Sequence, residues 1–376
     1  MKLFECQSCG HPLYFENMRC ESGGARLGYL PNQETVTALR ADGENWRALA
    51  DRRRRYRFCA NAAHGVCNWL ILADHEDRFC VGCRHNRTIP DLSRADNLAH
   101  WRLIEAAKHR LFYTIIKLRL PLAMKADDPA GLAFDFLEDT SATASGPAVL
   151  TGHANGLITI SLAEADDAER ERRKQAMGEP YRTLLGHFRH EVAHYYWSRL
   201  VANSSRLEQC RQLFGDDRKD YSAALKAYYA DGAPVTWPDH FVSAYAASHP
   251  WEDFAETWAH YFHMIDTLET AGVFGLVVNP KLTRMLAAKI DFDPLDVDME
   301  RIIKGWLPLT FAVNSINRSM GVPDLYPFVL IPPVTAKLAF IHDCIRQHAG
   351  RWSAEDGGLR AMIAGLRKRA GSPGAR

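Results

Sequence analysis

The segment His190-Glu191-Val192-Ala193-His194 decides the expected fold, because it places two histidines four residues apart. Imidazoles at i and i+4 lie on one face of a helix and can reach a single metal ion. The neighbouring apolar residues recur at helical spacing: Leu184, Leu185, Phe188, Val192 and Tyr195. Proline is favoured in the first turn of a helix, so Pro180 is the expected start. The segment predicts a buried, metal-binding helix with Glu191 beside the two ligands.

A catalytic zinc ion takes three protein ligands and keeps one position for water, so this pair needs a partner. A third histidine on the same segment is ruled out, because Trp197 and Leu200 stand at the required positions. A second predicted helix, from Pro250 to about residue 270, carries Glu252 and Glu256 at i and i+4. We expect Glu252 to be the third ligand. We expect Glu256 to accept the remaining ring N–H of a ligating histidine.

The chain around these helices reads as an α+β protein that is mostly α. Residues 97–120 carry apolar side chains at helical spacing, and a helix is expected there. Residues 202–232 form a polar segment that is also expected to be helical. Two strands are predicted, Leu132–Leu137 and Leu157–Leu162, the second after the turn dipeptide Asn155-Gly156. A small sheet beside the helices is therefore expected.

Seven of the nine cysteines lie in the first 83 residues, which indicates a small module that uses metal in place of a large core. Four of them supply the thiolates of a closed tetrahedral zinc site: Cys59, Cys67, Cys80 and Cys83. Thiols at C-x-x-C spacing favour metal binding in a reducing compartment over disulfides. A structural zinc ion is expected there.

The other group, Cys6, Cys9 and Cys20, has one C-x-x-C pair but lacks a fourth cysteine. Gly23 stands where a second such pair would place it. His11 is one substitute ligand, and loss of the metal is the alternative. Spacing alone also permits Cys6 and Cys9 to join Cys80 and Cys83. One or two structural zinc ions are therefore expected beside the catalytic one.

These patterns divide the chain into three parts: a cysteine-rich zinc-ribbon domain at 1–92, a metal-binding domain at 96–350, and a polar, partly disordered tail at 351–376. The 46 basic and 45 acidic residues leave a net charge of +1, so nucleic acid is not an expected partner. The basic run from Arg52 to Arg57 is interpreted as a solvated turn. No apolar stretch is long enough to span a membrane, and we expect a cytoplasmic protein.

The two metal-site motifs resemble those of the gluzincins, the zinc peptidases with a glutamate ligand. The resemblance is strongest to the branch with a tyrosine seven residues before that glutamate, where Tyr245 stands. The whole chain, to about residue 345, is similar to a bacterial family of zinc-binding metallopeptidases with an N-terminal zinc ribbon. The motifs that carry this similarity are Cys67-Asn68-Trp69-Leu70, Asn86-Arg87-Thr88-Ile89-Pro90 and Glu252-Asp253-Phe254-Ala255-Glu256.

The resemblance implies a zincin-like domain that hydrolyses peptide bonds in a peptide or protein, with Glu191 as general base and Tyr245 as a donor to the oxyanion. It also suggests that the strand at Leu157–Leu162 is the sheet edge that pairs with substrate. The ribbon would dock a protein or be purely structural. The alternative function is a non-catalytic ribbon protein that retains the peptidase fold, and nucleic-acid binding is a weaker third.

Overall fold

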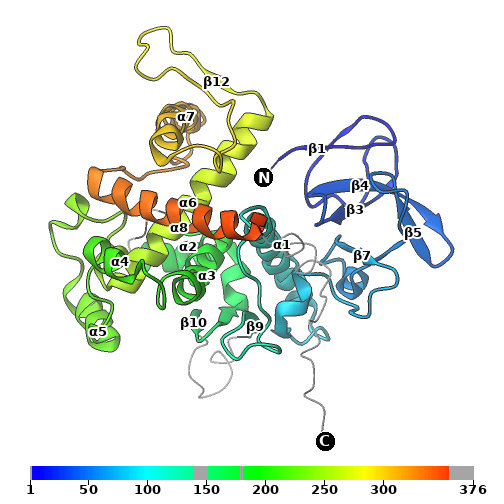
Figure 1. Cartoon of the computed structure of the whole chain (residues 1–376), viewed down its shortest axis with the longest axis horizontal. Helices are drawn as coiled ribbons and strands as arrows, with labels where there is room; N and C mark the ends of the chain where they lie inside the picture. The colour runs from blue at the N-terminus through cyan, green and yellow to red at the C-terminus, as the bar shows by residue number, and fades with distance from the viewer. Residues whose placement is uncertain (1, 139–150, 178, 180, 355–376) are drawn as a thin grey trace, which may run out of the picture. The chain divides into compact units, whose positions relative to one another are not determined.

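The computed structural model describes residues 2–138, 151–177, 179 and 181–354 (Figure 1). These residues divide into two compact units, the first consisting mainly of Phe4–Arg84 and the second mainly of His85–His348. Strands dominate the first unit and helices the second. The expected α+β fold, mostly helical and with a cysteine-rich N-terminal module, is confirmed. Of the predicted tail, everything beyond Ala354 lies outside the described residues.

The first unit is built on an antiparallel sheet with the strand order β3-β4-β5-β6-β7. These strands are β3 (Arg26–Leu30), β4 (Thr35–Asp42), β5 (Asn45–Ala48), β6 (Tyr56–Phe58) and β7 (Leu70–Leu72). Each contributes one residue to a buried cluster: Leu30, Leu39, Ala48, Tyr56 and Leu70. The short strands β1 (Phe4–Glu5) and β2 (Pro12–Leu13) pair separately. A second group of buried aromatic residues in this unit includes Phe15, Tyr29 and Trp69.

The second unit contains a sheet with the strand order β10-β11-β9-β8. Its strands are β8 (Asn86–Thr88), β9 (Ala133–Leu137), β10 (Gly152–Ala154) and β11 (Leu157–Ser161). Asn155 and Gly156 join β10 to β11 with φ values of 47° and 81°, as a tight hairpin turn requires. The expectation that the strand at Leu157–Leu162 forms the sheet edge is wrong, because β10 pairs with its free side. Among the described residues, β10 is the edge strand on that side of the sheet and β8 is the edge strand on the other.

The α-helices that follow are α1 (Ala95–Lys117), α2 (Asp167–Met177), α3 (Leu184–Leu200), α4 (Leu207–Phe214), α5 (Tyr221–Asp231), α6 (Pro250–Val273), α7 (Met299–Ser319) and α8 (Pro332–Ala354). The predicted start of α6 at Pro250 is confirmed. The predicted start of α3 at Pro180 is wrong, and Pro180 itself lies outside the described residues. The helix begins at Leu184 because the Thr183 side chain accepts the N–H of Gly186 at 3.0 Å and caps it.

Helices α3 and α6 pack side by side in the middle of the second unit (Figure 1). The rings of Tyr196 on α3 and Trp258 on α6 stack at 5.2 Å with an interplanar angle of 15°. A buried ion pair between Arg189 and Asp266 joins the same helices. A buried pair of this kind fixes one relative placement of two elements, because either charge alone would be costly to bury. The α3–α6 pair is therefore a rigid base for side chains on both helices.

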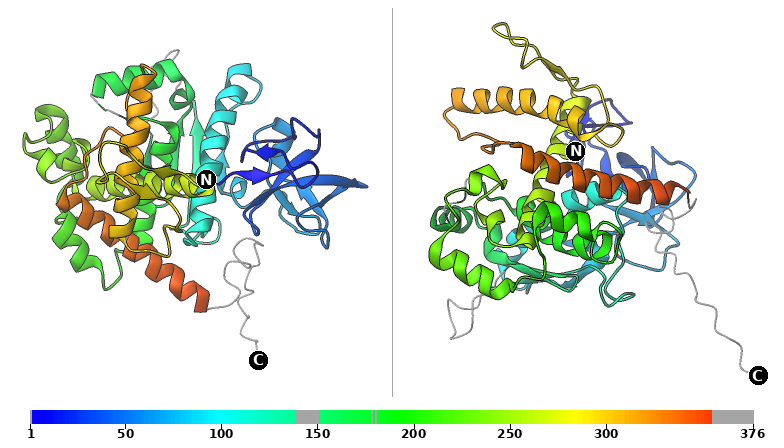
Figure 2. Two further views of the ribbon diagram at one scale, coloured as in Figure 1. Left: turned by 90° about the horizontal axis from the view of Figure 1, so that it is seen from above. Right: turned by 60° about the vertical axis from the view of Figure 1, so that its left-hand side comes forward.

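Helix α8 crosses α6 (Figure 2), where the Tyr261 hydroxyl and His342 Nδ1 form a hydrogen bond of 2.8 Å. Beyond the C-terminal end of α6, strands β12 (Val277–Val278) and β13 (Ala288–Lys289) form a hairpin beside α7. Among the described residues, no helix is both long enough and apolar enough to cross a membrane.

Candidate metal centre

The α3–α6 packing brings together three side chains that the sequence proposes as metal ligands. Ligand atoms of His190, His194 and Glu252 all lie within 4.8 Å of one another. His190 Nε2 is 2.9 Å from Glu252 Oε2, and His194 Nε2 is 3.7 Å from Glu252 Oε1. Two ligands held about 2.0–2.1 Å from a tetrahedral zinc ion stand roughly 3.3 Å apart, so these separations fit the ion.

Glu256 lies one turn beyond Glu252 and holds the other ring nitrogen of His190. His190 Nδ1 donates to Glu256 Oε1 at 2.7 Å, as the sequence leads one to expect. The hydroxyl of Ser243 donates to the other oxygen of the same carboxylate at 2.7 Å. Because Nδ1 carries the proton in this hydrogen bond, Nε2 is the nitrogen left for a metal.

The titration of the three candidate ligands follows from burial and from their contacts. Burial, with a contribution from the neighbouring His190 and His153, lowers the pKa of His194 to about 3, so this imidazole is neutral and able to bind metal. Burial opposes a charge on His190, but hydrogen bonds to Glu252 and Glu256 outweigh it and raise the pKa. Burial opposes ionisation of Glu252 too, yet the hydrogen bond from His190 lowers its pKa to about 2. The ion pair is what these groups form without a metal, and a divalent cation would take the place of the Nε2 proton.

Glu191 lies on α3 between the two histidines and is only partly exposed. Burial raises the pKa of its carboxyl, and the nearby charge of Glu252 adds to this effect. A carboxylate with a raised pKa is a better proton acceptor at neutral pH, as a general base requires. The environment of Glu191 thus suits the role that the sequence suggests.

Two tyrosines lie against the centre from different elements. Tyr245, in the turn Tyr245–Ala247, has its ring 5.9 Å from that of His190, and burial raises the pKa of its hydroxyl, which stays protonated. Tyr221 opens α5 and donates its hydroxyl to Glu252 Oε1 at 2.7 Å. The sequence gives no sign of Tyr221, since it stands 31 residues from Glu252 in a polar segment. The contact depends on how the α4–α5 segment folds back over α6.

His153 on the edge strand β10 is a further neighbour that the sequence does not reveal. Its ring stacks on that of His194 at 5.8 Å with an interplanar angle of 22°. Its Nε2 accepts the backbone N–H of Gly156 at 2.8 Å, so the proton of the neutral ring is on Nδ1. The turn Asn155-Gly156 predicts the hairpin, but only the packing of the sheet on α3 places its edge beside the metal centre.

The other histidines near the two motifs have partners elsewhere. His187 faces Glu164, with Nδ1 3.3 Å from the carboxylate. His260 and the hydroxyl of Tyr326 form a hydrogen bond of 2.7 Å, and His263 contacts Arg189. None of the three joins the ligand group among the described residues. The three histidines therefore stabilise the packing around the centre through contacts with other residues.

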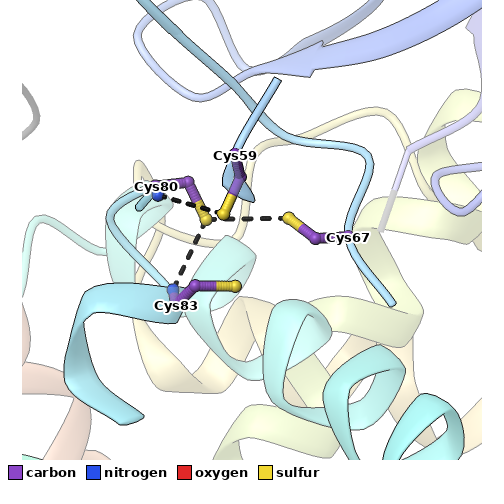
Figure 3. Close-up of side chains that lie close together, drawn as sticks. All are labelled: Cys59, Cys67, Cys80 and Cys83. Carbon is purple, nitrogen blue, oxygen red and sulfur yellow. Dashed lines mark hydrogen bonds between the residues drawn. The ribbon is translucent and has the colours of Figure 1, made fainter. Parts of the chain in front are cut away.

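Four cysteines of the first unit form a second candidate metal centre, here called the four-cysteine site. The thiols of Cys59, Cys67, Cys80 and Cys83 point toward one another (Figure 3), and all four side chains are buried. The Cys67 and Cys80 sulfurs are 3.8 Å apart, close to the roughly 3.8 Å between thiolates that each lie about 2.3 Å from one zinc ion. Burial raises the pKa of Cys67 and Cys83, so a metal is needed to hold them as thiolates.

Cys6, Cys9 and Cys20 form a separate group, here called the three-cysteine site, whose sulfurs lie within 4.8 Å of one another. The alternative pairing of Cys6 and Cys9 with Cys80 and Cys83 is therefore wrong. Among the residues that the structure describes, no fourth metal ligand joins the three-cysteine site. His11, which the sequence offers as one substitute ligand, is not part of the group.

Comparisons with known proteins identify the family to which each part of the chain is similar. Residues 97–344 match the model of a family described as "putative zinc-binding metallo-peptidase", and residues 3–94 match that of a zinc-ribbon domain. Uncharacterized proteins of Mycobacterium bovis and of two strains of Mycobacterium tuberculosis are each 41% identical over 352 residues, covering 93% of this chain and 96% of theirs. No solved structure matches the chain. The chain thus belongs to this zinc-binding metallopeptidase family and carries an N-terminal zinc ribbon.

Proposed function

We propose that the chain is a zinc-dependent peptidase in which His190, His194 and Glu252 hold the catalytic ion. The observation that carries this proposal is the convergence of these three ligand atoms within 4.8 Å, from two helices that are 50 residues or more apart in sequence. A purely structural histidine pair would not need two carboxylates on the facing helix, one for each ring nitrogen of His190.

The residues around the site divide the remaining chemistry among them. A bound zinc ion would lower the pKa of a water molecule and polarise the scissile carbonyl group. Glu191 accepts the water proton and delivers it to the departing amine. Tyr245 donates its hydroxyl to the oxygen that gains charge, and Glu256 keeps the ring of His190 in one orientation. Tyr221 donates its hydroxyl to Glu252 and holds that carboxylate in place.

The substrate class that suits this arrangement is an extended peptide. Strand β10 is the edge of its sheet and packs against α3, which carries the histidines. A free edge offers backbone N–H and C=O groups that an extended segment can pair with. His153, whose Nδ1 carries a proton, lies on that edge beside His194. A peptide or a flexible protein segment added to β10 would therefore run past the metal centre.

The metal content that we propose is one catalytic ion and one structural ion in the four-cysteine site, with a second structural ion in the three-cysteine site. Seven of the nine cysteines gather in these two sites, and use of cysteine for metal binding supports a reducing compartment such as the cytoplasm. These statements rest on the donor sets and their spacing.

The test of the function is a comparison of the wild type with Glu191→Gln on a library of denatured proteins, read by mass spectrometry of newly formed termini. Glutamine keeps the size of the side chain but cannot take the proton, so cleavage should fall by about 10²-fold or more. Glu300→Gln, an exposed substitution on α7, serves as the control. Equal cleavage by wild type and Glu191→Gln would refute the proposed base. A complete lack of wild-type cleavage with full zinc loading would favour the non-catalytic binding protein.

A further inference from the structure

The three-cysteine site has the backbone of a four-ligand zinc site but lacks one side chain. In the four-cysteine site, the N–H of Cys83 donates to the sulfur of Cys80 at 3.4 Å, across a C-x-x-C turn. The N–H of Gly23 donates to the sulfur of Cys20 at 3.3 Å in the same way. Gly23 therefore stands at the position that corresponds to Cys83, the position of a ligand.

The space at Gly23 faces the sulfurs. A Cβ atom built on Gly23 would lie 2.9 Å from the Cys9 sulfur and 3.9 Å from the Cys20 sulfur. The Cys9 and Cys20 sulfurs are 3.5 Å apart, near the separation expected for two thiolates on one zinc ion. The backbone brings position 23 to the site, where the Cys9 side chain packs against it, but glycine supplies no ligand atom there.

The three-cysteine site is also partly exposed to solvent. Cys6 and Cys20 are buried, whereas Cys9 and Gly23 are exposed. In the four-cysteine site, by contrast, each thiol is at most 2% exposed. His11 contributes its backbone carbonyl, which accepts the N–H of Cys6 at 2.9 Å, but its ring is not part of the ligand group.

We propose that Cys6, Cys9 and Cys20 bind one zinc ion through three thiolates and leave its fourth position open to a thiolate from outside the chain. Zinc completes a tetrahedral set, so water fills the open position until a better donor arrives. An incoming thiol displaces that water and binds as the thiolate, and its proton passes to solvent. Sulfur is preferred because thiolate is the softer donor and the three ligands already present are thiolates. The ligand class is thus a small thiol or an accessible cysteine.

The experiment replaces zinc with Co²⁺ in the full-length chain and records the thiolate-to-cobalt charge-transfer absorption. Subtracting the spectrum of Cys9→Ser isolates the three-cysteine site, since the other centres are common to both proteins. We expect Gly23→Cys to raise this absorption by about one-third, from three thiolates to four. Gly23 does not have a positive φ, so cysteine is sterically allowed there once Cys9 shifts slightly. Ser22→Cys, one residue out of register and exposed, should leave the absorption unchanged.

The second arm adds 2-mercaptoethanol as the outside thiol. The wild-type absorption should rise by about one-third to the Gly23→Cys value, while that of Gly23→Cys should stay constant. Three results would overturn the proposal. The first is equal absorption of the wild type and Cys9→Ser, and the second is a wild-type absorption that does not change when thiol is added. The third is a His11→Ala variant whose absorption band is weaker than that of the wild type or lies at another wavelength. The first would mean that no metal binds, and the last that His11 completes the site.

Discussion

The hydrogen bond between His190 Nδ1 and Glu256 allows the ligand arrangement to be tested without touching a ligand. Glu256→Ala removes the acceptor at 2.7 Å and leaves His190, His194 and Glu252 in place. In the wild type, burial opposes ionisation of Glu256, but the contact with His190 outweighs it and lowers the pKa, so a carboxylate faces the ring. The ring loses both its fixed orientation and the negative charge that makes Nε2 a stronger donor.

The expected loss of zinc affinity follows from one of the two hydrogen bonds that Glu256 accepts. Glu256 binds His190 through Oε1 and Ser243 through Oε2, and only the first affects the metal site. Removing a hydrogen-bond partner of a ligating histidine typically costs about 10- to 100-fold in metal affinity. This corresponds to about 1.4 to 2.7 kcal/mol. Glu256→Gln keeps an oxygen acceptor but not the charge, so its loss should be smaller.

The assay is competition for zinc with a chromophoric chelator, in which the two cysteine sites contribute equally to every variant. The zinc ion held by His190, His194 and Glu252 should be released from Glu256→Ala at a chelator concentration about 10- to 100-fold lower than from the wild type. Glu300→Ala, whose side chain is 73% exposed on α7, should match the wild type. An unchanged zinc affinity in Glu256→Ala would refute the assignment of His190 Nε2 as a ligand.

Three further predictions follow from the same contacts. Glu191→Gln should keep the zinc content of the wild type and lose about 10²-fold or more of its peptidase rate, measured by kcat. Tyr221→Phe removes the hydrogen bond that holds the Glu252 carboxylate in place, so the zinc dissociation constant should rise by up to about tenfold, as for the loss of other partners of metal ligands; equal affinity would contradict a role of this contact in metal binding. Burial opposes ionisation of Glu164, but its contacts with His187 and Arg182 outweigh burial and lower the pKa from 4.5 to about 2. The ionised Glu164 therefore stabilises the fold above pH 4.5, and this stabilisation is lost as the pH falls toward 2. Urea unfolding should show Glu164→Gln less stable than the wild type by about 3 kcal/mol at pH 7, with the gap closing below pH 4.5; a pH-independent gap would contradict it.

The parts of the centre that the sequence predicts are those set by local periodicity. His190 and His194 share a face because they are four residues apart in a helix, and the same holds for Glu252 and Glu256. Pairing the two motifs required chemical reasoning about a third ligand, and the packing of α3 on α6 places them within reach. Their roles as ligands stay predictions until metal is measured.

The parts that the sequence does not predict depend on long-range packing or on weak local signals. Tyr221 and His153 reach the centre only through the fold of the α4–α5 segment and the sheet. The start of α3 differs from the predicted one because Thr183, rather than a proline in the first turn, caps the helix. The edge strand differs because the three residues of β10 are too few to show an alternating pattern.

The measurement that tests the central claim most directly is the zinc content per chain of the wild type and of His190→Ala, determined by elemental analysis on folded protein. The substitution leaves the cysteine sites of the zinc ribbon unchanged, so His190→Ala should contain one zinc ion fewer than the wild type. The unfolding of the zinc ribbon should stay the same. Equal zinc content in the two proteins would contradict a metal centre at His190, His194 and Glu252.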